Sequence, residues 1–177
     1  MRSGPRLSFR RRGWTCVGTN PATSTTAWPS GAIRGSSRYT SGRALDREAV
    51  WARLLRHPRH WALLGFGYWV VVERVTGRFV GEVGVARFER ETPGLLPELG
   101  LLPEAGWVLR PWAHGQGYAR EAVEAVLAWR DVHLPVQGTF CLIHPDNTPS
   151  LRLARRMGFV PVSEVGEPNH PLTLLRR

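Results

Sequence analysis

Two glycines in the segment His114-Gly115-Gln116-Gly117-Tyr118-Ala119 restrict the possible fold of this chain more than any other feature. The apolar run 105–109 precedes them and is halted by Pro111, as at the end of a strand. After them, apolar residues recur at helical spacing over residues 118–129. Because glycine has no β-carbon, backbone N–H groups at the helix start can face an open groove. The pattern predicts a strand, a glycine turn and a helix, with an anion site at the turn.

This glycine turn is not one of the common nucleotide-binding loops. It lacks the G-x-x-x-x-G-K-[ST] pattern of a P-loop, and it has no third glycine at the spacing of a dinucleotide fingerprint. Taken alone, it fits an ordinary strand-to-helix turn as well as it fits a ligand site.

The remaining periodicity predicts one α+β domain with a mixed, mostly antiparallel central sheet flanked by helices. Asp46 is a plausible N-cap for a first helix that ends before Pro58. Thr76-Gly77 can turn a hairpin between two strands rich in β-branched and aromatic residues. The expected elements after the first helix are strands 66–74 and 79–88, a loop over 92–103, strand 105–109, helix 118–129, strand 139–143, helix 148–157, and weaker strands 159–165 and 172–175.

The net charge of +10 is concentrated at one end of the 177-residue chain. Residues 1–43 hold eight arginines and no acidic residue, so the rest of the chain is nearly neutral. We expect an irregular, Arg-rich segment at 1–37 and a folded domain over 38–177. The sequence contains no base-reading motif, so we expect no specific nucleic-acid partner; non-specific binding through the basic segment stays an alternative.

The sequence does not favour a membrane or a metal. No apolar run approaches the roughly 20 residues of a membrane-spanning helix. Cys16 and Cys141 are far apart and suggest neither a disulfide scaffold nor a metal site. We therefore expect a soluble, cytoplasmic protein with no membrane partner and no metal.

A second motif makes the glycine turn specific. It runs from His144 to Ser150, continues into a helix and ends at Met157-Gly158-Phe159. Together the two motifs resemble the GNAT superfamily of N-acetyltransferases, whose cofactor loop has the form [QR]-x-x-G-x-[GA] and whose later motif is N-x-x-[SA], a helix and G-F. The ribosomal-protein alanine N-acetyltransferase-like branch is the most similar, because G-x-G-Y-A-x-E-A recurs there. The resemblance covers about residues 39–177 and implies the acyl-CoA N-acyltransferase fold.

The resemblance implies acetyl-CoA as co-substrate and carries the family's cofactor contacts onto this chain by position. The pyrophosphate-holding residues are Gly115, Gln116, Gly117, Tyr118, Ala119 and Arg120. Trp107, Val108 and Leu109 correspond to the strand whose backbone edge pairs with the pantetheine arm. Asn147 matches the residue whose side chain reaches the pantetheine; it also fits the N-cap of the following helix.

Acetyl transfer needs a deprotonated amine, and the sequence offers three bases. Glu104 begins the strand near the expected acceptor and is the first candidate, either directly or through water; a merely solvated carboxylate is its alternative. Glu82, between two glycines of the preceding strand, is the second, and it too can instead face outward. His114 ranks third, since its position in the cofactor loop lies near phosphate.

Two departures from the family pattern affect function. Many members place a tyrosine acid where this chain has Ala154, so the thiolate leaves unassisted, or Ser150 or a water supplies its proton. Related chains also carry a first strand and helix that residues 1–37 do not resemble. A misread start or frame, a diverged segment and a disordered one stay open, and the fold can lack an edge strand.

The expected function is transfer of an acetyl group to a primary amine, either a protein N-terminal α-amine or a small amine. A non-catalytic acyl-CoA-binding protein is the alternative, favoured by Ala154. The chain can act as a monomer or a homodimer.

Overall fold

The fold, a computed structural model, is built on an eight-stranded sheet of order β1-β2-β3-β4-β5-β6-β8-β7. The structure describes residues 7–8, 14–18, 47–89, 91–95 and 97–177. The strands are β1 (Leu7–Ser8), β2 (Trp14–Gly18), β3 (Tyr68–Glu73), β4 (Phe79–Ala86), β5 (Glu104–Leu109), β6 (Phe140–Ile143), β7 (Val160–Glu167) and β8 (His170–Arg176). The helices are α2 (Arg47–Leu64), α3 (Pro97–Gly100), α4 (Tyr118–His133) and α5 (Thr148–Arg156), with a 3-10 turn η2 at Pro111–Ala113.

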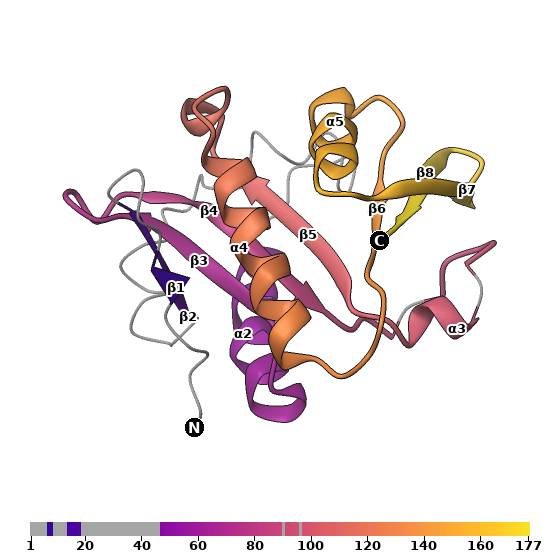
Figure 1. The fold of residues 1–177 in the computed structure, drawn as a ribbon, viewed down its shortest axis with the longest axis horizontal. Coiled ribbons are helices and arrows are strands. Elements are labelled where there is room, and N and C mark those ends of the chain that lie inside the picture. Colours follow the sequence, from indigo (N-terminus) through magenta and orange to yellow (C-terminus); the bar gives the residue numbers. More distant parts are fainter. Residues whose placement is uncertain (1–6, 9–13, 19–46, 90, 96) are drawn as a thin grey trace.

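Helices α2 and α4 pack on opposite faces of the sheet. Successive residues of a strand point to opposite faces, so Tyr68 and Trp69 of β3 do so as well. His57 of α2 stacks on Tyr68, whereas Trp129 of α4 packs edge-on against Trp69 at 5.1 Å. Trp61 of α2 contacts both Trp69 and Trp129 and so joins the two layers. In Figure 1, α4 crosses the strands in front and α2 lies at the lower end of the sheet.

Helix α2 is longer than the sequence predicts. It was expected to end before Pro58, yet it continues through this proline to Leu64. Proline in a helix interior removes one hydrogen bond and clashes with the preceding turn. Here His57 and Trp61 lie four residues apart on one face of the helix, and both are buried. Tertiary burial on both sides of Pro58 therefore outweighs the local cost of the proline.

The N-terminal edge of the sheet also differs from expectation. The sequence shows no element in residues 1–37, but β2 pairs antiparallel with β3 from Trp14↔Glu73 to Gly18↔Trp69, and β1 pairs with β2. The sheet therefore does not lack an edge strand. The positions where related chains carry their first helix, the N-cap Asp46 and most of the segment predicted to be irregular lie outside the described residues.

The remaining elements follow the predictions closely. The hairpin turns at Gly77, the strands β3 to β8 and the helices α4 and α5 lie where periodicity places them, and α4 extends to His133. The predicted loop 92–103 contains the short helix α3. None of the helices described is long and apolar enough to cross a membrane.

The parallel pairing between β5 and β6 is very short. Along its whole length, β5 pairs antiparallel with β4. With β6, however, it pairs at one register, Glu104↔Phe140, where both strands begin. The two strands are connected by α4, as a parallel pair requires a crossover. From Ala105 onward, β6 therefore does not pair with β5, and we call this side of β5, from Ala105 to Leu109, the opening.

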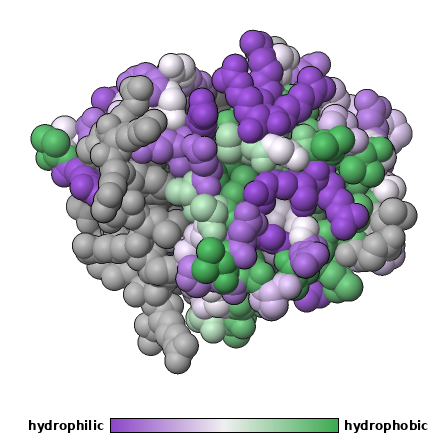
Figure 2. Space-filling view, in the orientation of Figure 1, coloured by the Kyte–Doolittle hydropathy of each residue, from purple (hydrophilic) through white to green (hydrophobic). Residues whose placement is uncertain are grey.

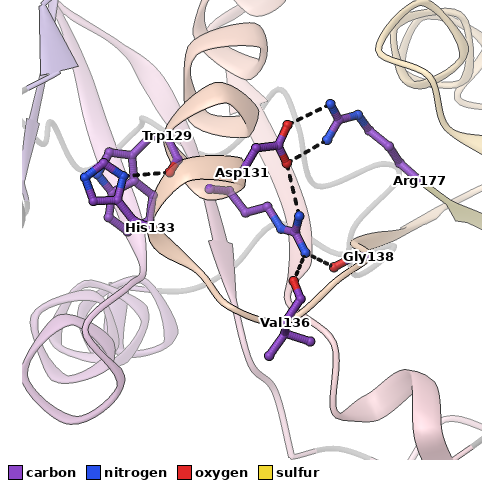
Figure 3. A network of polar contacts seen from close by, with 7 residues as sticks. Trp129, Asp131, His133, Val136, Gly138 and Arg177 are labelled. Atoms are coloured by element: carbon purple, nitrogen blue, oxygen red, sulfur yellow. Dashed lines mark hydrogen bonds and ion pairs between the residues drawn. The ribbon is translucent and has the colours of Figure 1, made fainter.

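A polar network ties the end of α4 to the C-terminus (Figure 3). Arg177 makes two hydrogen bonds to the Asp131 carboxylate, at 2.9 and 3.0 Å. Buried Arg130 also donates to Asp131, and it donates to the carbonyls of Val136 and Gly138 in the α4–β6 connection. The network fixes the path by which α4 leads into β6.

We expect Asp131→Asn to destabilise the protein. The hydrogen bond from Arg177 lowers the pKa of Asp131 below its ordinary value of 3.8, so the carboxylate stabilises the fold above that pH and ceases to do so as the pH falls through the lowered pKa. Since the side chain is 39% exposed, solvent screens the pair, and the expected loss at neutral pH is about 1 kcal/mol.

Urea unfolding of the wild type and Asp131→Asn at neutral and acidic pH measures this difference. The exposed Glu124 of the same helix supplies the control Glu124→Gln. A difference that stays unchanged as the pH falls from neutral through the lowered pKa of Asp131 would show that its charge is not responsible.

Candidate active site

The glycine turn opens α4 with an exposed backbone. Gly115 and Gly117 have φ angles of 72° and 85°, in the left-handed region that favours glycine. Gly117 is the N-cap of α4, and the first intrahelical bond runs from Glu121 N to its carbonyl oxygen at 3.2 Å. A β-carbon on either glycine would meet no protein atom within 4 Å. The first-turn N–H groups of a helix point out of its N-terminal end, so this turn can receive an anion.

Contacts to the preceding strand and to η2 hold the turn. The His114 ring nitrogen Nε2 lies 3.1 Å from the Leu109 carbonyl oxygen, and the Gln116 amide donates to the Trp112 carbonyl at 2.5 Å. The Arg78 guanidinium stacks over Trp112 at 3.8 Å. His114, the third predicted base, therefore lies at the exposed turn with its ring directed back to the end of β5.

The opening beside β5 is bordered by the start of α5. The Trp107 indole donates to the Ser150 hydroxyl at 3.3 Å. The Asn147 side-chain oxygen accepts from Ser150 N at 3.3 Å, which makes Asn147 the N-cap of α5. The structure thus brings Trp107 and Asn147 together through one serine and confirms the capping role; the pantetheine contact of Asn147 stays a prediction.

Positive charge surrounds this end of the molecule. Helix α5 and the start of α4 lie at the same end in Figure 1. Figure 2 shows a hydrophilic surface over α5, where Arg152, Arg155 and Arg156 are exposed. Arg120 is exposed on the first turn of α4. Such a field attracts an anionic ligand toward the glycine turn.

A cleft of about 560 Å³ lies at the other end of β5. Glu104 and Phe140, the paired first residues of β5 and β6, both line it. Glu89 and Glu91 line it as well, and Arg87 forms an ion pair with Glu89 at 2.8 Å. Among the described residues that line it, the cleft therefore has three carboxylates and one guanidinium, and one of the carboxylates is Glu104, the first predicted base.

Glu82, the second predicted base, has different surroundings. Its side chain is buried, and its Oε2 lies 2.8 Å from Nε2 of the buried His57. It does not line the cleft. The expectation that Glu82 faces the acceptor directly is therefore not supported by its position, because α2 covers it.

A model of the GNAT acetyltransferase domain matches residues 27–160 of this sequence. The chain belongs to the GNAT acetyltransferase family. A protein of Bordetella pertussis assigned to the GnaT acetyltransferase family shares 29% identity and a TM-score of 0.84, covering 98% of this chain and 99% of that one. The ribosomal-protein-S5-alanine acetyltransferase of Vibrio fischeri shares the fold at 17% identity and a TM-score of 0.74, covering 97% and 96%.

Among curated proteins, the uncharacterized protein YkkB of Bacillus subtilis is 27% identical over 113 residues. The match covers 64% of this chain and 62% of YkkB, so it spans less than two thirds of that relative.

GNAT acetyltransferases use acetyl-CoA, and the residues at the glycine turn suit its phosphates. The turn combines an outward-facing helix N-terminus with nearby arginines, which is the donor set that a pyrophosphate requires. The described residues include no group of three or more His, Cys, Asp and Glu side chains placed to hold a metal. Ala154, at the position of the family's tyrosine acid, is fully buried.

Sequence reasoning missed His57 and Tyr68. The ring of His57 stacks on Tyr68 with centroids 5.1 Å apart, against the same sheet face as Glu82. The available signal was a pair of glycines, Gly84 and Gly106, inside strands that otherwise carry large side chains. Such glycines indicate a close approach by another group.

We expect Gly117→Asp to weaken acetyl-CoA binding by about tenfold or more, since a carboxylate would stand beside the pyrophosphate, and tenfold corresponds to about 1.4 kcal/mol. Calorimetric titration with acetyl-CoA measures it. Gly65→Asp is the matched control, because Gly65 has a φ of 74° and equally open surroundings at the end of α2. Equal affinities for the two variants would mean that the cofactor site lies elsewhere.

Proposed function

We propose that this chain transfers an acetyl group from acetyl-CoA to a primary amine. One observation carries the proposal: the glycine turn and the acidic cleft lie at opposite ends of β5, and β5 and β6 are paired only at their first residues, Glu104 and Phe140. A donor held at the turn and an acceptor held in the cleft would then meet along one strand.

In this proposal, the backbone at Gly115–Arg120 holds the pyrophosphate, favoured by the dipole of α4. The pantetheine arm runs along Trp107, Val108 and Leu109 on the side that faces away from β4. The β4 side is already paired, with Gly81↔Leu109, Glu82↔Val108 and Val83↔Trp107 in register. This direction leads the thioester from the turn toward Glu104.

Glu104 is the proposed base. It would accept the proton of the acceptor amine, directly or through water, as the amine attacks the thioester carbonyl. Its position at the junction of β5 and β6 supports this role, because the cleft reaches the opening at that residue. Holding the two reactants together can contribute roughly 7 to 11 kcal/mol in favourable systems, so positioning supplies much of the rate.

The cleft supports two classes of acceptor. Its volume of about 560 Å³ lies in the range of small-molecule sites, which favours a small amine. Its carboxylates attract any ammonium group, including a protein α-amine. The fold shared with the Vibrio fischeri ribosomal-protein acetyltransferase is a reason to test peptide N-termini first. A thiol-release screen with acetyl-CoA against peptides, polyamines and aminoglycosides distinguishes the classes.

The second candidate is an acyl-CoA-binding protein without catalysis, and the buried Ala154 favours it. The same screen separates the two functions. Binding of acetyl-CoA by calorimetry, with no thiol released for any amine, would establish the binding protein and reject the transferase.

We expect Glu104→Gln to lower kcat by about 100-fold or more, as general bases contribute roughly 10²–10⁴ to rates. The dissociation constant for acetyl-CoA should not change, and the acidic limb of the pH-rate profile should disappear. Steady-state kinetics over pH with the acceptor found in the screen measures both. Glu167→Gln, on the exposed end of β7, is the control. An unaltered profile in Glu104→Gln would dismiss Glu104 as the base.

A further inference from the structure

The side chain of Tyr68 crosses two strands of the sheet. Tyr68, Gly84 and Gly106 are neighbours in register on β3, β4 and β5. A β-carbon on Gly84 would clash with Tyr68 Cα and the Gly67 carbonyl oxygen and would lie 2.8 Å from Tyr68 Cγ, and one on Gly106 would clash with the Tyr68 hydroxyl oxygen. The phenol ring therefore starts over β4, and its hydroxyl lies directly on the backbone of β5.

Two glycines inside strands, Gly84 and Gly106, lower the stability of the sheet. A glycine inside a strand or helix destabilises by roughly 0.5–1 kcal/mol relative to alanine. Neither Gly84 nor Gly106 has a positive φ, so backbone conformation does not require them. Steric contacts do: a side chain at Gly106 would displace the Tyr68 hydroxyl, and one at Gly84 would clash with the β3 backbone at Gly67 and Tyr68 as well as with the base of the ring.

A buried pair behind the ring holds it in place. The His57 ring stacks on Tyr68 at 5.1 Å with an interplanar angle of 23°. His57 in turn contacts Glu82 at 2.8 Å, and only 4% of His57 and 1% of Glu82 are exposed. Among the described residues, no hydrogen-bond partner reaches His57 Nδ1. His57 of α2 thus packs on the phenol ring, and Glu82 of β4 holds His57 in place.

The hydroxyl lies where the reaction is expected. Gly106 follows the β5–β6 junction at Glu104 by two residues, so it is at the beginning of the opening. Residues two apart in a strand share a face and are separated by about 7 Å. The phenol hydroxyl and Glu104 therefore border one face of β5 at the reacting end of the proposed acetyl-CoA site.

We propose that Tyr68 is the proton donor for the leaving thiolate and that the His57–Glu82 pair positions it. The inference rests on the proposed acetyl transfer. After the amine nitrogen has bonded to the carbonyl carbon and lost its proton to Glu104, the carbon–sulfur bond breaks and its electron pair goes to sulfur. Sulfur takes the phenol proton, and the proton held by Glu104 returns, through water, to the phenolate. A tyrosine from β3 would thus replace the tyrosine acid that α5 lacks at Ala154.

The test uses Tyr68→Phe in the full chain, with acetyl-CoA and the amine found in the screen. The variant keeps the ring and removes the hydroxyl. We expect kcat to fall by about 10- to 100-fold, as for loss of one general acid, with unchanged affinity for acetyl-CoA. The alkaline limb of the kcat profile, where the phenol would ionise, should disappear.

Two further variants separate chemistry from structure. Gly106→Ala keeps the phenol but displaces it, so its kcat should fall in the same way. His57→Gln should lower kcat less than Tyr68→Phe, and the double variant should equal Tyr68→Phe alone, because His57 acts through Tyr68. His133→Gln, whose ring stacks on Trp129 at 4.7 Å on the exposed end of α4, is the control and should keep wild-type kcat.

The outcomes distinguish this inference from the proposed function. If the wild type releases thiol and Tyr68→Phe retains wild-type kcat and pH profile, the role of Tyr68 is overturned and the transferase stands. If the wild type binds acetyl-CoA and releases no thiol with any amine, both fail.

Discussion

The architecture of the site depends on one backbone pairing, that of Glu104 with Phe140. A parallel pair cannot be closed by a tight turn, so the connection between β5 and β6 must run through α4 and return on the sheet. Because the strands meet only where they begin, the side of β5 from Ala105 to Leu109, toward the start of α4, has no pairing with β6. The glycine turn, the opening and the acidic cleft are consequences of this divergence.

The network around Asp131 stabilises that pairing from the C-terminal end of α4. It joins the end of α4 and the connection to β6 with the C-terminal Arg177 (Figure 3). Thr139 and Arg177 also exchange two backbone hydrogen bonds of 2.8 Å each. The start of β6 is therefore held by β8 and by α4 together, which keeps Phe140 beside Glu104.

Glycines serve two different physical purposes in this site. Gly115 and Gly117 adopt positive φ angles in open surroundings, so they shape the backbone that faces a ligand. Gly84 and Gly106 have no positive φ, and glycine is needed there because a side chain would clash with the β3 backbone at Gly84 and with the Tyr68 hydroxyl at Gly106. The first purpose has a local signature, a strand followed by a helix. The second depends on the register of three strands, which no local pattern reveals.

Apart from the short helix α3, local periodicity alone determined the order of strands and helices from residue 66 onward and the place of the glycine turn. Spacing of 2.0 or 3.6 and Pro or Gly breaks are properties of neighbouring residues. Pairing and burial between distant segments decided the rest. Burial of Trp61 and His57 lets α2 continue past Pro58. Pairing with β3 adds β2 to the edge of the sheet. The same long-range contacts bury Glu82 behind His57, since only the packed fold shows which strand face a helix covers.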